Sequence, residues 1–265
     1  DASDDARAVE SGIDPEPFDT PTVVGTEHYG PPEPGALWPI LLAVSFLTAV
    51  ASFIYEIGWT RMLPLAMGGA THSFELMLSA FILGLALGAL AIRQRTDGTR
   101  EPLKLLGWIQ WLMGLAALAT IPVYLGTFDL MGGLVRTLPG MPAGYTAFAM
   151  GRYGIALAVM LPSTVLAGMT LPLITTTLLR AGHGERSIGW VYGVNTLGSV
   201  MGVAAAGLVI LPWVGLKNMV VTGAGLDMVV GVVILAYAFR GRHRVPGRAV
   251  LTTAVATILA CGLVG

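Results

Sequence analysis

Charge and cysteine are scarce in this sequence. Of its 265 residues 12% are charged and 54% are hydrophobic, whereas soluble domains carry about 25% charged residues. The single cysteine, Cys261, excludes an internal disulfide and any metal site built from several cysteines. The four histidines include no pair at the i, i+4 spacing of a helical haem or zinc site. We therefore expect neither a metal nor a cofactor.

Signatures of enzymes are missing as well. The sequence has no glycine-rich phosphate loop and no HExxH, CxxC or GxSxG pattern. The run Met67-Gly68-Gly69 lacks the strand and helix that surround a nucleotide site. The sequence therefore predicts no soluble catalytic domain, no enzymatic activity for residues 1–265 and no nucleic-acid partner.

Long apolar runs dominate the rest of the chain. Each is near the ~20 residues that cross a bilayer as a helix. The runs cover roughly residues 36–57, 72–92, 103–125, 146–178, 187–213, 217–239 and 249–265. Pro162 and Pro172 interrupt the fourth, which is too long for one straight crossing. Residues 36–265 are therefore predicted to form an all-α, polytopic transmembrane helical bundle with about seven spans, in contact with lipid.

Residues 1–35 form an acidic, proline-rich N-terminal tail. Up to Pro34 the tail holds nine acidic residues, six prolines and a single basic residue, Arg7. Such a segment cannot bury enough apolar surface to offset the entropy that it loses on ordering. We expect the tail to lie along other membrane protein subunits; the alternative is that it folds back on the loops of its own chain.

Basic residues predict the orientation of the spans, because loops rich in Lys and Arg stay in the cytoplasm. The 2–3, 4–5 and 6–7 loops hold ten of them: Arg93, Arg95, Arg100, Lys104, Arg180, Arg186, Arg240, Arg242, Arg244 and Arg248. The opposite side holds four: Arg61, Arg136, Arg152 and Lys217. The sequence therefore predicts a protein of a bacterial inner membrane with these three loops, and the tail, in the cytoplasm.

Two spans carry glycines four residues apart, Gly84 and Gly88 in the second and Gly198 and Gly202 in the fifth. Membrane helices gain little by hiding apolar surface from lipid, and they associate through the close packing that small residues allow. The two pairs predict two tightly packed helices and say nothing about chemistry.

Polar groups at membrane depth are costly unless they are paired, and they often mark function. The candidates are Glu56, Glu75, Asn195 and Asp227. On a functional interpretation the three carboxylates line a cation pathway that binds an amine or relays a proton, and Asn195 contributes to binding a substrate whose identity is unknown.

A structural interpretation of the same groups stays open. Glu56 and Glu75 would then pair with Arg61 at the membrane interface, and Asn195 would form a hydrogen bond between helices. Arg152 is the partner of Asp227 that charge alone suggests.

Four stretches occur in order along residues 40–235: YEIGWTR (Tyr55–Arg61), AFILGLALG (Ala80–Gly88), LPSTVLAGMTLPL (Leu161–Leu173) and the glycine-rich run Val191–Leu216. Together they resemble the membrane region of bacterial spermidine synthase-like membrane proteins, in which a transporter-like membrane domain is fused to an aminopropyltransferase domain. The resemblance implies a membrane fold. The Rossmann-like domain that binds decarboxylated S-adenosylmethionine in this family has no counterpart in the sequence, so the resemblance does not imply aminopropyl transfer by this chain.

Three functions fit these features. The first is a non-catalytic integral subunit of a larger membrane protein complex. The second is a transporter or polyamine-binding membrane domain, and the third is the membrane anchor of an aminopropyltransferase whose catalytic domain is absent from this chain. We rank the subunit first.

Overall fold

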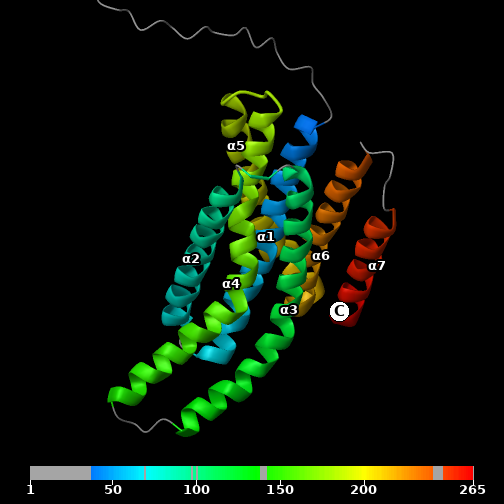
Figure 1. Ribbon diagram of the computed structural model, residues 1–265. Helices are drawn as coiled ribbons and strands as arrows, with labels where there is room; N and C mark the ends of the chain where they lie inside the picture. The colour runs from blue at the N-terminus through cyan, green and yellow to red at the C-terminus, as the bar shows by residue number, and fades with distance from the viewer. Residues whose placement is uncertain are drawn as a thin grey trace, which may run out of the picture. The chain divides into compact units, whose positions relative to one another are not determined.

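Helices account for almost all of the chain that the computed structural model describes, which comprises residues 37–68, 70–96, 98–99, 101–137, 142–240 and 247–264. In order they are α1 (Leu37–Met67), α2 (Ala70–Thr96), α3 (Pro102–Thr137), α4 (Pro142–Arg180), α5 (Arg186–Ala204), the π-helical turn η1 (Ala205–Ile210), α6 (Leu211–Arg240) and α7 (Gly247–Val264) (Figure 1). These residues hold no strand. The all-α prediction is therefore confirmed for the described part of the chain, and the predicted tail lies outside it.

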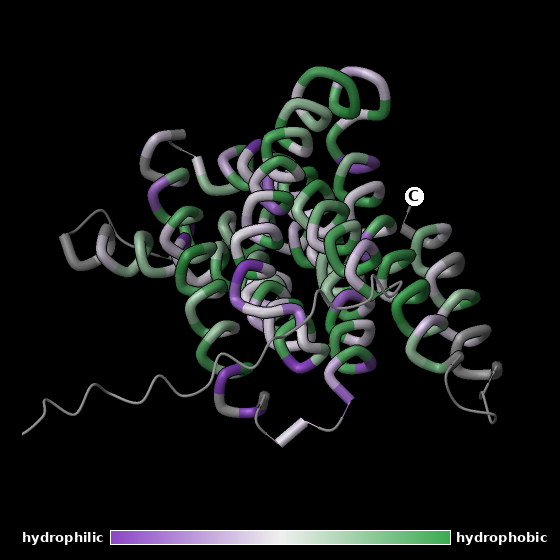
Figure 2. Tube along the Cα trace, turned by 90° about the horizontal axis from the view of Figure 1, so that it is seen from above, coloured by the Kyte–Doolittle hydropathy of each residue, from purple (hydrophilic) through white to green (hydrophobic). Residues whose placement is uncertain are grey.

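Five helical stretches are long and apolar enough to cross a membrane: Leu37–Met67, Ser73–Arg93, Pro102–Arg136, Thr146–Arg180 and Arg186–Phe239. Large apolar side chains also face outward; Leu208 is 77% exposed and Trp213 is 84% exposed. Hydrophobic residues recur along the helices in the view from above (Figure 2). An apolar surface of this kind marks contact with a membrane or with a partner.

The last of these stretches, Arg186–Phe239, contains the predicted fifth and sixth spans. Its 54 residues would extend about 80 Å as one straight helix, more than twice the thickness of a bilayer core. Gly215 interrupts it with φ 77° and ψ 177°, a conformation that glycine adopts readily because it lacks a Cβ. The predicted seventh span is represented by the shorter apolar helix Thr252–Gly262, so the count of seven remains a prediction.

Helix α5 packs parallel to α1 through the two glycines of its GxxxG pair. A Cβ at Gly198 would meet the carbonyl oxygen of Phe46, and a Cβ at Gly202 would lie 2.8 Å from the carbonyl oxygen of Val50. The later glycine of α5 lies against the later residue of α1, so the two helices run in the same direction. Their backbones are too close for any side chain between them.

Helix α6 returns along α1 in the opposite direction. Gly58 lies against Val220, whereas Gly223, further along α6, lies against the carbonyl oxygen of the earlier residue Ala51. The chain therefore reverses between α5 and α6, in the region where Gly215 breaks the helix. Helices α5 and α6 pass α1 in both directions, as two successive spans would.

Two further pairs of helices meet at glycines. In the α2–α4 pair Gly84 lies against the side chain of Thr164 and Gly88 against the carbonyl oxygen of Val165. In the α3–α6 pair a Cβ at Gly231 would lie 2.6 Å from the backbone nitrogen of Trp111. The four-residue spacing does not identify the α3–α6 pair, because the glycines of α3 that face α6, at positions 107 and 114, are seven residues apart.

The α1–α5 contact can be tested with two glycines of one helix. Gly198→Ala places a methyl group on the α1 backbone, whereas a methyl group added at Gly193 would have nothing within 4 Å. Overpacking costs about 1–3 kcal/mol, and alanine favours a helix over glycine by about 1 kcal/mol. We expect Gly198→Ala to lower the melting temperature of the detergent-solubilised chain, followed by circular dichroism, and Gly193→Ala to leave it unchanged or raise it. Equal shifts in the two variants would contradict backbone contact between α1 and α5.

Candidate functional site

A cavity of about 160 Å³ lies among α1, α2, α4 and α5. Five polar side chains line it: Thr48, Ser52, Thr170, Asn195 and Ser199. Its remaining wall is apolar and includes two aromatic rings, from Phe53 and Phe81. Hydroxyl and amide groups beside aromatic rings can hold a small polar or cationic group inside an otherwise apolar bundle.

Asn195 faces this cavity from α5 and is half-buried. Its backbone carbonyl accepts a hydrogen bond of 3.0 Å from the Ser199 hydroxyl. Among the hydrogen bonds of the described residues, none involves the side-chain amide of Asn195. The predicted interhelical hydrogen bond of Asn195 is thus not seen there, and the amide is available to an occupant of the cavity.

Thr48 and Ser52, the two polar α1 residues of the cavity, also connect to further buried polar groups. The side-chain nitrogen of Gln110, on α3, donates to the Thr48 hydroxyl, and the Ser52 hydroxyl lies 3.0 Å from that of Tyr55. Gln110 is fully buried, and its side-chain oxygen has no hydrogen-bond partner in the described part of the chain. The polar wall of the cavity is therefore backed by a second polar layer.

The polar face of α1 was not predicted as a site, although its residues are spaced along the sequence in a recognisable way. Ser45, Thr48, Ser52 and Tyr55 follow one another at intervals of three or four residues, which places them on one side of a helix. Ser45 uses its position to donate a 3.1 Å hydrogen bond to the carbonyl oxygen of Val191, on α5. A polar stripe at helical spacing within an apolar span is the pattern that indicates this face.

Asp227 is fully buried in α6. Neither of its carboxylate oxygens has a hydrogen-bond partner among the described residues. The ring of Tyr55 packs against Gly223, one helical turn before Asp227. A carboxylate in such surroundings is costly unless it binds a cation or a proton.

The other two candidate carboxylates do not join Asp227. Glu56 is half-buried in α1, with its Oε2 buried and unbonded, and Glu75 is exposed near the start of α2. No salt bridge joins Glu56 to the exposed Arg61 in the part that the structure describes. That part also contains no group of three His, Cys, Asp or Glu side chains that could hold a metal ion. The structure therefore does not bring the three carboxylates together along one pathway.

Arg152 does not pair with Asp227, as charge alone suggested. It is buried in α4, and its Nη2 donates to the carbonyl oxygen of Gly68 at 2.6 Å and to the hydroxyl of Ser73 at 2.7 Å. The guanidinium also lies over the ring of Phe148. Arg152 therefore fastens the turn between α1 and α2 to α4, because its hydrogen-bond donors satisfy backbone and hydroxyl oxygens there.

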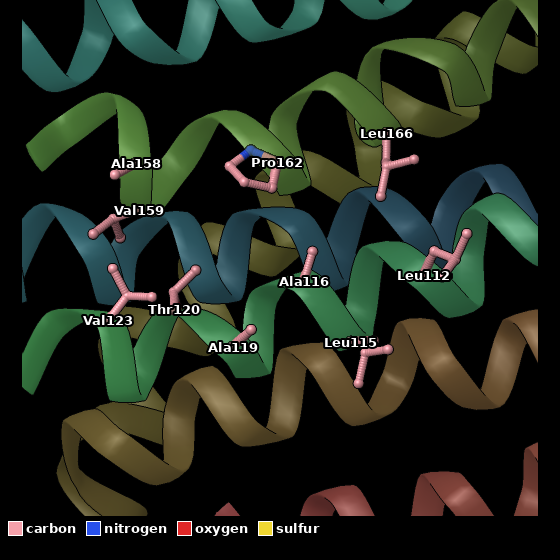
Figure 3. A pocket seen from close by; sticks show the side chains of 10 residues that line it. All are labelled: Leu112, Leu115, Ala116, Ala119, Thr120, Val123, Ala158, Val159, Pro162 and Leu166. Atoms are coloured by element: carbon pink, nitrogen blue, oxygen red, sulfur yellow. The ribbon is translucent and has the colours of Figure 1, made fainter. Parts of the chain in front are cut away.

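A second cavity, of about 410 Å³, opens between α3 and α4 (Figure 3). It is lined by Leu112, Leu115, Ala116, Ala119, Thr120, Val123, Ala158, Val159, Pro162 and Leu166. Its one polar side chain, Thr120, already accepts from Trp59 Nε1 at 3.0 Å and donates to the carbonyl oxygen of Ala117 at 2.6 Å. The groove is lined by apolar side chains, as a lipid-facing crevice is, and its one polar group is already hydrogen-bonded.

The chain is similar to several polyamine aminopropyltransferases. It is 27% identical over 231 residues to polyamine aminopropyltransferase 1 of Streptomyces coelicolor, covering 85% of this chain and 39% of that protein. It is 27% identical over 236 residues to the polyamine aminopropyltransferase of Mycobacterium tuberculosis, with coverages of 85% and 40%. With that of Corynebacterium efficiens the identity is 23% over 246 residues, covering 89% of this chain and 42% of the relative.

The chain thus spans about two fifths of the length of the curated relatives that it matches. No family model matches it, and no solved structure does. The matches over most of the chain support a spermidine synthase-like relationship.

The contrast between Arg152 and Asp227 yields a test of which charged group is structural. Arg152→Met removes two hydrogen bonds from a buried cation, and hydrogen bonds to charged groups contribute about 1.5–3 kcal/mol each. Asp227→Asn keeps the shape of the side chain and breaks no hydrogen bond of the described residues. Thermal unfolding in detergent should show a clear loss of stability for Arg152→Met and none for Asp227→Asn. A comparable loss for Asp227→Asn would assign Asp227 a structural partner.

Proposed function

We propose that this chain is a non-catalytic, membrane-embedded helical subunit of a larger membrane protein complex, related to the membrane region of spermidine synthase-like proteins. The main support for the proposal is that the segment similar to the aminopropyltransferases is made of apolar helices. It covers 85% of the chain, and its described residues form apolar helices. Five of the helical stretches suit a bilayer, and their outward side chains suit lipid or neighbouring subunits.

The proposed orientation places the basic loops in the cytoplasm of a bacterium. It is supported by a contact between two of these loops, since Arg180 Nη1 donates a 2.8 Å hydrogen bond to the carbonyl oxygen of Thr99. The end of α4 and the α2–α3 loop therefore lie at the same end of the bundle. Arg61, Arg136 and Lys217 belong to segments that the proposal assigns to the opposite side.

A second candidate function, a polyamine-binding or transporting membrane domain, is favoured by the polar cavity. The relatives are named for polyamine chemistry, and a polyamine is a flexible chain that ends in ammonium groups. The cavity offers hydroxyl and amide oxygens beside the rings of Phe53 and Phe81, which suit an ammonium group. The third candidate, an anchor for an aminopropyltransferase domain, requires that catalytic domain to lie beyond Gly265 or on another chain.

Purification of the native protein from mild detergent tests the first function. We expect other membrane proteins to co-purify with the chain, and the chain alone to transfer no aminopropyl group from decarboxylated S-adenosylmethionine to putrescine. Intact-mass measurement separates the third function, because a native mass close to the 27.7 kDa of this sequence excludes a covalently attached catalytic domain. A monomer that runs alone, with a tail that proteases remove readily, would contradict the subunit proposal.

Equilibrium dialysis with radiolabelled spermidine tests the second function. Asn195→Leu and Thr170→Val each remove a polar group from the cavity wall and should weaken binding about tenfold, as the loss of one hydrogen bond does. Thr222→Val is a matched control, because Thr222 is exposed on α6 and its hydroxyl bonds only to the carbonyl oxygen of Asn218. Unchanged affinity in both cavity variants, or no binding by the parent chain, would remove this candidate.

A further inference from the structure

A chain of hydroxyl groups leads from the polar cavity to the buried carboxyl group of Asp227. Ser52 lines the cavity, and its Oγ shares a 3.0 Å hydrogen bond with the hydroxyl of Tyr55. Tyr55, which is 1% exposed, packs at the contact between α1 and α6, with its ring against Gly223, one helical turn from Asp227. Hydroxyl groups both donate and accept hydrogen bonds, so such a chain can pass a proton in either direction.

The register of α1 against α6 fixes this arrangement. A Cβ at Gly223 would lie 3.2 Å from Cδ1 of Tyr55, and Asp227 is one helical turn further along the same face of α6. Because the Tyr55 hydroxyl bonds to Ser52, it points toward the N-terminus of α1. The two helices are antiparallel, so this direction leads along α6 from Gly223 toward Asp227.

No hydrogen bond or salt bridge joins Asp227 to an opposite charge in the described residues. Helix α1 presents Tyr55, with Glu56 next to it in sequence, and α3 presents the uncharged side chain of Gln110 from its buried face. Helix α7 places Cys261 beside Gly225, and η1 has no titratable residue. Neither oxygen of Asp227 is hydrogen-bonded among these groups. A structural ion pair therefore does not account for this carboxyl group, whereas a bound proton would remove its charge.

We propose that Asp227 is a membrane-embedded proton-binding site, which exchanges its proton with the cavity through Tyr55 and Ser52. On release, the Asp227 O–H bond breaks and the proton passes to the Tyr55 oxygen. The Tyr55 proton passes to the Ser52 oxygen, and the Ser52 proton passes to a water molecule or an amine in the cavity. Uptake follows the same steps in reverse, and each hydroxyl group ends with the one proton that it began with.

This site depends on the packing of α1 against α6 and not on a partner subunit or on affinity for spermidine. It assigns the cavity a further property, because any base that occupies it is connected to a proton reservoir inside the bundle. A test of the site therefore needs only this chain, and its outcome is independent of co-purification and of spermidine binding.

Infrared spectroscopy of the chain in lipid vesicles tests the proposal. The difference spectrum between the parent chain and Asp227→Asn at neutral pH isolates the C=O stretching band of a protonated carboxyl group at position 227. Transfer into D₂O shifts this band as O–H becomes O–D, and the rate of the shift measures proton exchange. Tyr55→Phe keeps the ring that packs on Gly223 and removes the hydroxyl group, and Ser52→Ala interrupts the chain at its other end.

We expect the band in the parent chain, and exchange that is about tenfold slower in Tyr55→Phe and Ser52→Ala, as the loss of one hydrogen bond along the path implies. Thr222→Val is the matched control, since it removes an exposed hydroxyl group of α6 that lies outside the cavity and bonds to the Asn218 carbonyl; its exchange rate should equal that of the parent. No protonated band at neutral pH, or parental exchange rates in Tyr55→Phe and Ser52→Ala, would overturn the proposal. If Tyr55→Phe loses its helical amide bands, Ser52→Ala alone decides the outcome.

Discussion

Direct contact between helix backbones at glycines is the interaction on which the rest of this structure depends. Lipid competes equally for apolar side chains, so helices in a membrane need close packing to prefer one another. The pairs α1–α5, α2–α4 and α3–α6 each meet where a glycine lies against the backbone or the short side chain of its neighbour. At such distances carbonyl groups also receive weak C–H hydrogen bonds. The glycines thus determine which helices are neighbours and in which register.

That register brings the polar stripe of α1 into contact with several helices at once. Ser45 reaches α5, Thr48 reaches α3, and Tyr55 lies between Ser52 and α6. Further along, Trp59 Nε1 donates to Thr120 of α3. Each of these polar groups is isolated in the sequence, but together they form one hydrogen-bonding stripe that reaches several neighbouring helices. The proposed path from the cavity to Asp227 depends on this register.

The sequence predicts the helical class and the position of most helices, because apolar runs of about 20 residues have few alternatives to a helix. It identifies Gly198 and Gly202 as well as Asp227, since a glycine pair and a charge both stand out in an apolar run. It does not reveal Gly107 and Gly114, whose seven-residue spacing is common by chance. The sequence does not predict which polar side chains of different helices bond to one another either. Arg152 and Asp227 have complementary charges, yet Arg152 bonds to Gly68 and Ser73, because the pairing of charges depends on the neighbours and rotation of each helix. A charge pattern along one chain does not contain that information, whereas the spacing of polar residues within one helix, as in α1, does.

The order in which the helices pair has a consequence for how the protein is made. Among the described helices α1 is synthesised before all others, whereas its close neighbours α5 and α6 come four and more helices later along the chain. Membrane helices insert individually and associate afterwards, so in a bilayer the polar stripe of α1 would lack these neighbours until α5 and α6 have been made. During that interval Ser52 and Tyr55 have each other as hydrogen-bond partners but lack the helices that later enclose them.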